Sequence, residues 1–196
     1  NNLRVCTVLS EAYSEVFGFT REEVAKLADA LGRHDKLAEI QEWYDGYNFG
    51  GQEIYNPWSV IQYFQENCRP AAYWVNTSAN GIIRKMMQRV GRKVEGELNQ
   101  LMQGNVVSKN VHESIIYEAI GNNADDFYTL LLTTGYLKAV SIEPDSFGEK
   151  VALKIPNREI YNLFRVEIVR YMTGYRGVSD VMDMLNSMLA GNQDDF

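Results

Sequence analysis

The chain has 196 residues, of which 45% are hydrophobic and 12% aromatic, so it can bury a substantial core and should fold throughout. This length fits one large domain or two small ones. Its 19 basic and 26 acidic residues give a formal net charge of −7, which excludes a surface that binds nucleic acid over its whole extent and leaves only a local basic patch.

Cysteine usage and hydropathy exclude two further classes of protein. Cys6 and Cys68 lie far apart with no Cys-x-x-Cys spacing, so neither a disulfide scaffold nor a structural zinc site is predicted. The longest uncharged apolar run, residues 128–136, is far shorter than the roughly 20 residues of a membrane-spanning helix. We expect a cytoplasmic chain and, because it does not begin with Met, a piece of a longer protein.

Local signals predict the elements of the first third. Thr20 and Glu23 form a capping box, which predicts a helix that begins at Thr20 and ends at Gly32. A second helix is expected over about 34–44. Aromatic residues alternating around a Gly-Gly pair predict a β-hairpin at about 44–56. Asn56 as N-cap and Pro57 at the first helical position predict a helix to about residue 67.

The next region carries the most informative charge pattern. A helix is expected over 77–90, and the helix-weakening Gly91 separates it from another over about 93–103. Ile82, Ile83, Met86, Met87 and Val90 fall on one side of the first helix. Five basic residues lie away from this apolar side, with no acid among them: Arg84, Lys85, Arg89, Arg92 and Lys93. They predict either a phosphate-binding face or an ordinary solvated one.

The last third changes to mixed helix and strand. A helix is expected over 124–134, then strands over 136–142 and 150–155 joined by a long tip at 143–149. Extended pieces are expected at 106–107 and 115–117, and helices at 158–173 and 179–190. We therefore predict a mainly α-helical α+β fold: a helical region over 1–104 with the aromatic hairpin, then a winged-helix-like module over 105–196.

No catalytic machinery is recognisable in the chain. A nucleotide-hydrolysing loop ending in Gly-Lys-Ser/Thr is missing. Pro144-Asp145 and Glu149-Lys150 resemble a nuclease motif only superficially, since Glu149 and Lys150 are adjacent and all four lie in the expected tip. His34 and His112 have no partner at metal-pair spacing. We predict no catalytic residue, no metal ligand and no activity for this chain alone.

Acidic residues argue against nucleic-acid binding at two places outside the basic helix, the aromatic block and the winged-helix-like module. The aromatic block at 43–59 could stack on bases, but Asp45 and Glu53 lie beside the rings and no basic residue occurs over 37–68, so a packed hairpin is favoured. In the winged-helix-like module, the expected groove-entering helix begins Asp125-Asp126 and the hairpin tip is acidic. This module should pack against protein and not against DNA.

The order of motifs along the chain resembles the prokaryotic AAA-ATPase-like family, whose members often carry a C-terminal PD-(D/E)XK nuclease-like domain. The resemblance spans nearly the whole chain. It rests on Asn1-Asn2-Leu3, Phe17-Gly18-Phe19-Thr20-Arg21-Glu22-Glu23-Val24, Trp43-Tyr44-Asp45-Gly46-Tyr47, Tyr55-Asn56-Pro57-Trp58-Ser59, Tyr73-Trp74-Val75-Asn76-Thr77-Ser78, Gly135-Tyr136-Leu137-Lys138 and Ile155-Pro156-Asn157-Arg158-Glu159.

This resemblance implies the helical lid and winged-helix-like region of a predicted ATPase. The P-loop core, with its ATP and Mg²⁺, would precede the Asn-Asn-Leu segment, and the nuclease-like domain would follow Phe196. We expect these two domains to be the partners of this chain, and we expect no membrane association. A lid commonly supplies an arginine to the γ-phosphate, for which Arg84 and Arg89 are the candidates. The alternative function is nucleic-acid binding, with Lys85, Arg92 and Lys93 contacting phosphates.

Overall fold

The chain folds into helices and two small antiparallel sheets, which confirms the predicted α+β class. The computed structural model describes residues 12, 16–74, 80–111, 124–145 and 148–172. The helices are α1 (Arg21–Ala30), the 3₁₀ helix η1 (His34–Lys36), α2 (Leu37–Tyr44), α3 (Pro57–Gln65), α4 (Asn80–Met102), α5 (Ala124–Thr133) and α6 (Arg158–Met172). The strands are β1 (Tyr47–Phe49), β2 (Gln52–Ile54), β3 (Val107–Val111), β4 (Lys138–Asp145) and β5 (Gly148–Lys154).

The local signals in the first third produce the elements they predict. Thr20 accepts from the backbone N–H of Glu23, whose carboxylate accepts from the Thr20 N–H at 2.8 Å, so α1 begins with a complete capping box. Gly50 and Gly51, at φ values of +56° and +87°, form the two-residue turn between β1 and β2. Asn56 accepts from the N–H groups of the first turn of α3.

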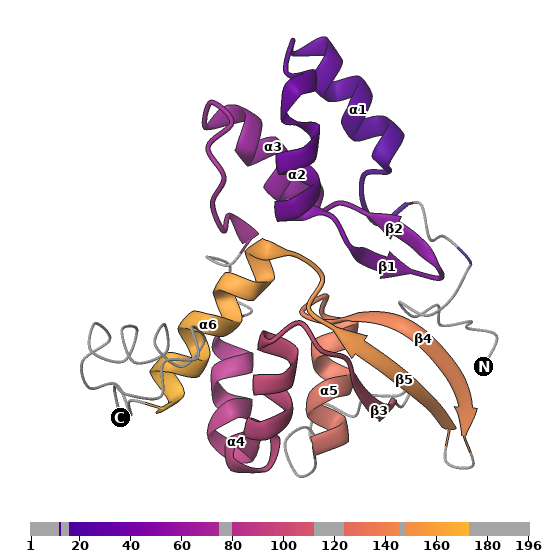
Figure 1. Ribbon diagram of the computed structural model, residues 1–196, viewed down its shortest axis with the longest axis vertical. Helices are drawn as coiled ribbons and strands as arrows, with labels where there is room; N and C mark the ends of the chain where they lie inside the picture. The colour runs from indigo at the N-terminus through magenta and orange to yellow at the C-terminus, as the bar shows by residue number, and fades with distance from the viewer. Residues whose placement is uncertain (1–11, 13–15, 75–79, 112–123, 146–147, 173–196) are drawn as a thin grey trace, which may run out of the picture.

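The aromatic hairpin lies between two hydrophobic cores. In Figure 1, α1–α3 and the hairpin form the upper part of the molecule, and the three-stranded sheet with α4, α5 and α6 forms the lower part. Tyr55 joins Tyr44 and Tyr63 in the smaller core of the upper part. Tyr47 and Ile54 join the larger core instead. Because the side chains of successive strand residues point to opposite faces, neighbours such as Ile54 and Tyr55 pack in different cores.

The larger core surrounds the three-stranded sheet, whose strand order is β3-β5-β4. Helices α4, α5 and α6 contribute to it, and on α6 the predicted inward residues Ile160, Leu163, Phe164 and Ile168 are buried. Helix α4, which the predicted division at residue 104 assigns to the first region, packs in this core through Val90, Val94, Leu98, Leu101 and Met102. The division itself stays a prediction.

Two boundary predictions were wrong. The expected break at Gly91 does not occur, and α4 runs unbroken over 23 residues. Its apolar stripe continues through Val90 and Val94, and packing along that stripe outweighs the ~1 kcal/mol that an interior glycine costs. The helix that begins at Pro57 ends at Gln65, two residues before the predicted end, and the backbone turns left-handed at Asn67.

The hairpin of the larger sheet is also longer than predicted. Strands β4 and β5 pair as far as Asp145 and Gly148, so the expected long tip at 143–149 is mostly strand. Pro144 lies inside β4, which is tolerated because β4 is an edge strand and needs no donor on its open side. The extended piece predicted at 106–107 is the start of β3, whereas the extended piece at 115–117 and the helix at 179–190 fall outside the described residues.

Within the described part of the chain, no helix combines the length and the apolar character that a bilayer crossing requires.

Candidate functional site

The structure describes the basic face of α4 in part. Arg89 and Lys93 are exposed and lie one turn apart, while Val90 and Val94 are buried in the larger core. Arg84, Lys85 and Arg92 belong to the same helix, but their side chains fall outside the described residues. The helix is therefore amphipathic where it can be followed, and the assignment of Arg84 or Arg89 to a γ-phosphate stays a prediction.

The superficial nuclease motif lies on paired strands and not in a loop. Glu149 pairs with Pro144, and Lys150 pairs with Glu143. This corrects the expectation that these residues share one turn. Across the residues that the structure describes, no group of three His, Cys, Asp or Glu side chains could hold a metal ion.

His34 is a surface residue, as predicted. Its Nδ1 lies 2.5 Å from the Asp29 Oδ1, and both side chains are exposed. His112 lies outside the described residues.

The aromatic motifs from both halves of the sequence converge at one place, which we call the junction. It joins Trp43–Tyr47, Tyr55–Ser59, Tyr73–Trp74, Gly135–Lys138 and Ile155–Glu159, the described parts of five of the motifs on which the family resemblance rests. In Figure 1 it lies where the start of α6 meets the upper part of the molecule. Asn157 and Asp45, which are hydrogen-bonded in the junction, are 112 residues apart in sequence, so no local pattern could place these segments together.

Glu159 is the centre of the junction. Its side chain is fully buried, and its two oxygens accept hydrogen bonds from different segments: the Ser59 hydroxyl at 2.8 Å and the Trp74 backbone N–H at 2.7 Å. Burial raises the pKa of this carboxyl to about 7, although these two donors oppose the rise. One side chain thus holds the start of α6, the first turn of α3 and the segment after it.

Asn157 connects α6 to the aromatic hairpin. Its Oδ1 accepts from the Ile160 N–H at 3.0 Å and caps α6, while its Nδ2 donates to the Asp45 carbonyl at 2.8 Å. Beside it, Gly46 has φ +93°, and a Cβ at this position would lie 2.5 Å from the Pro156 carbonyl oxygen. Only glycine allows the two backbones to approach this closely.

A row of aromatic rings fills the space beneath these hydrogen bonds. Trp74 contacts Tyr47 and Tyr136, with ring centroids 6.3 and 4.8 Å apart, and Tyr136 contacts Phe164 at 6.5 Å. Gly135 has φ +80°, and a Cβ there would meet the Tyr47 ring at 3.1 Å. The prediction that the aromatic hairpin is packed and not an open stacking platform is thus confirmed for Tyr44, Tyr47 and Tyr55, all of which are buried.

Charges from the second half of the sequence balance the acidic hairpin. Lys138 pairs with Glu53 at 3.0 Å, and Arg158 pairs with Glu42 at 2.7 Å. The Arg158 guanidinium also lies 5.1 Å from the centroid of the Trp43 ring, a cation–π contact. The absence of basic residues over 37–68 therefore does not leave its acids uncompensated, since Lys138 of β4 pairs with the hairpin residue Glu53 and Arg158 of α6 pairs with Glu42 of α2.

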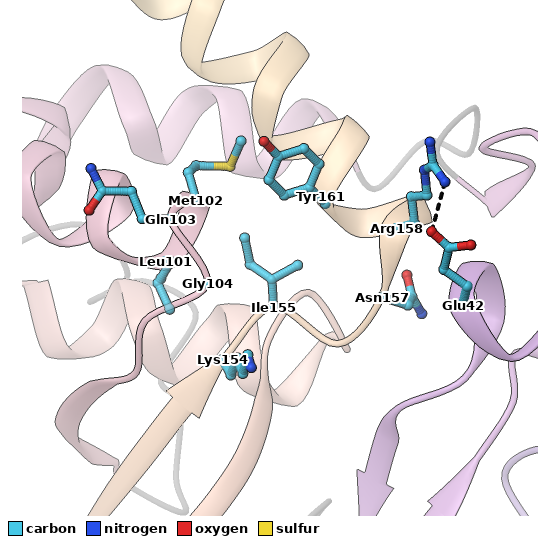
Figure 2. A pocket seen from close by; sticks show the side chains of 10 residues that line it. All are labelled: Glu42, Leu101, Met102, Gln103, Gly104, Lys154, Ile155, Asn157, Arg158 and Tyr161. Carbon is cyan, nitrogen blue, oxygen red and sulfur yellow. Dashed lines mark hydrogen bonds and ion pairs between the residues drawn. The ribbon is translucent and has the colours of Figure 1, made fainter. Parts of the chain in front are cut away.

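A groove adjoins the junction, with a volume of about 380 Å³. It is lined by the last residues of α4, the end of β5 and the first turn of α6, and Glu42 of α2 reaches it from the upper part of the molecule (Figure 2). The groove is open to solvent, whereas Glu159 is closed off from it by burial. In chemical terms, the buried carboxyl is suited to hold segments together, whereas the groove is open to a ligand.

Sequence reasoning missed the residues at the centre of the junction. Glu159 reads as an ordinary acid in the first turn of a helix, Asn157 as the cap of that helix, and Ser59 as a polar residue in the first turn of another. The signal that could have found them is their presence in motifs that share the family resemblance and are rich in Gly, Pro and aromatic residues.

Comparison with known proteins gives one distant relative and no family. No protein-family model matches the chain, and no solved structure matches it. An uncharacterized protein in the vnfD 5′ region of Azotobacter chroococcum mcd 1 is 28% identical over 195 residues. The match covers 98% of this chain and 35% of that relative, so the chain spans about a third of the relative's length.

Proposed function

We propose that this chain is the non-catalytic lid and winged-helix-like region of a predicted AAA-type ATPase in the cytoplasm. It would couple the nucleotide state of a P-loop core to a nuclease-like domain that follows. The observation that carries the proposal is the junction, because it ties the helical region to the sheet through Glu159 and Asn157. A buried, hydrogen-bonded connection of this kind transmits a movement instead of absorbing it.

The order of elements supports the winged-helix-like part of the proposal. A helix, a strand, a further helix and a two-stranded hairpin follow one another as α4, β3, α5, β4 and β5, and the first strand pairs with the last. The first turn of α5 carries Asp125 and Asp126, which would repel a DNA backbone. We therefore expect this module to contact protein.

The length of the relative agrees with a protein that has further domains, since the match covers only 35% of it. ATP and Mg²⁺ would belong to the core. The described residues offer no acidic cluster for the metal, so the contribution expected of this chain is an arginine, Arg84 or Arg89, placed toward the γ-phosphate. A guanidinium there stabilises charge that develops during hydrolysis.

The test is an assay of ATP turnover by a protein in which this chain is joined to the P-loop core that the proposal requires. Replacing the sensing arginine, Arg84→Ala or Arg89→Ala, should lower turnover about a hundredfold or more. Lys26→Ala, which removes an exposed cation from α1, is the matched control and should leave turnover unchanged. Unchanged rates in both arginine variants would remove the sensor assignment.

Nucleic-acid binding through α4 is the second candidate, favoured by the exposure of Arg89 and Lys93 on neighbouring turns. Together with Arg84, Lys85 and Arg92 they would contact phosphates. This function predicts that the chain alone binds a duplex oligonucleotide with an affinity that falls steeply as salt rises. A fluorescence-anisotropy titration without binding at low salt would dismiss it.

A further inference from the structure

The groove beside the junction has the dimensions and the composition of a small-molecule site. Its volume of about 380 Å³ lies within the range of about 300–1,000 Å³ found for ligand pockets. The apolar part of its lining comes from three elements: Leu101 and Met102 from the end of α4, Ile155 after β5, and the Tyr161 ring from α6. Figure 2 shows these side chains around one opening, with Arg158 and Glu42 at its other end.

Among the residues that the structure describes, the charges lining the groove leave one cation, Lys154, without a counter-charge. Arg158 is balanced by Glu42 at 2.7 Å. Lys154 is only partly exposed, and none of the described residues forms an ion pair with it. The groove also faces the first turn of α6, the positive end of a 15-residue helix. The electrostatic balance therefore favours a ligand with a single negative charge.

We propose that this groove binds a carboxylate carried on a small apolar or aromatic body. The carboxylate would pair with Lys154 at the end of β5, and the apolar body would lie against Met102, Ile155 and Tyr161. Glu42 disfavours a doubly charged phosphate, because a second negative charge would meet its carboxylate and compete for Arg158.

Sodium benzoate is the probe, and benzamide is its neutral counterpart of nearly the same shape. In an NMR titration of the amide resonances, benzoate should cause saturable shifts at Gly104, Asn157 and Tyr161, with a Kd of about 1 mM for a probe of this size. Benzamide should bind about fivefold more weakly or not at all. Equal binding of the two would overturn the role given to charge, and no saturable shift with benzoate would overturn the site.

Two variants on the same strand make the test specific. Lys154→Gln should weaken benzoate binding about fivefold. Lys150→Gln removes the same charge from the same face of β5, four residues away and outside the groove, and should leave the affinity unchanged. Both residues are at least partly exposed, so circular dichroism should report a native fold for each variant. Equal losses in the two variants would show general attraction to a basic surface and would refute the groove.

Discussion

Replacing Glu159 by glutamine should make the stability of the protein less dependent on pH. The glutamine has nearly the same shape, and it can keep both contacts of the carboxylate: its oxygen accepts from the Trp74 N–H, and its amide donates to the Ser59 hydroxyl. What the substitution removes is the ability to ionise. The difference between the two proteins therefore isolates the cost of a buried charge at the junction.

The size and the sign of the effect follow from the pKa of Glu159. Burial raises this pKa from 4.5 to about 7 in the folded protein, so folding favours the protonated carboxyl. The stability that the protonated Glu159 contributes is fully present below its pKa of 4.5 in the unfolded chain, and it is lost as pH rises through about 7. The difference corresponds to about 3 kcal/mol, of which about 2.5 kcal/mol is lost between about pH 5 and about pH 8.

The tyrosines near Glu159 do not add to this pH dependence of stability. The phenols of Tyr44, Tyr47 and Tyr73 lie near the carboxylate, and burial raises the pKa of each, so they stay neutral between these pH values. The Arg158 side chain is exposed and pairs with Glu42, not with Glu159.

Urea unfolding followed by tryptophan fluorescence at about pH 5 and about pH 8 measures the effect. The stability of Glu159→Gln relative to the parent should rise by about 2.5 kcal/mol between the two conditions. Glu53→Gln, which changes an exposed carboxylate paired with Lys138 of the junction, should show a change below about 1 kcal/mol. A difference between Glu159→Gln and the parent that stays constant, or that shrinks as pH rises, would refute the reasoning.

Two further substitutions test the geometry of the junction. Gly46→Ala should lower the free energy of unfolding in urea by at least about 3 kcal/mol, because its Cβ would lie 2.5 Å from the Pro156 oxygen. Gly51→Ala is the control, since Gly51 also has a positive φ but its Cβ would meet no atom within 4 Å, and it should cost about 1 kcal/mol. Similar losses in the two variants would contradict the close approach. Glu42→Gln should lower the free energy of unfolding by less than about 1 kcal/mol, because its ion pair with Arg158 is exposed, and this loss should vanish at high salt. A larger loss that does not change with salt would contradict the description of this pair as exposed and weak.

The features that the sequence predicted correctly are set by neighbouring residues. Thr20 and Glu23 cap a helix by contacts three residues apart, and Gly50-Gly51 forms a turn that only positive φ angles allow. Neither depends on the rest of the chain. Such signals located α1 and the hairpin closely, and they also predicted the aromatic residues of the hairpin as packed.

The features that the sequence did not predict depend on distant partners. Pro144 reads as a loop residue, yet pairing with β5 extends a strand through it. Gly91 reads as a helix break, yet burial of the flanking Val90 and Val94 keeps α4 continuous. The junction depends on contacts such as that between Asn157 and the Asp45 carbonyl, which no periodicity reveals.

Hydrogen exchange in Asn157→Asp tests the junction most directly. Aspartate can keep the cap on α6 through its Oδ1, but it loses the amide that donates to the Asp45 carbonyl across the junction. The account predicts faster exchange in the hairpin strands β1 and β2, with protection in the first turns of α6 unchanged. If the hairpin keeps the protection it has in the parent, the junction does not hold the two parts together and the proposed coupling fails.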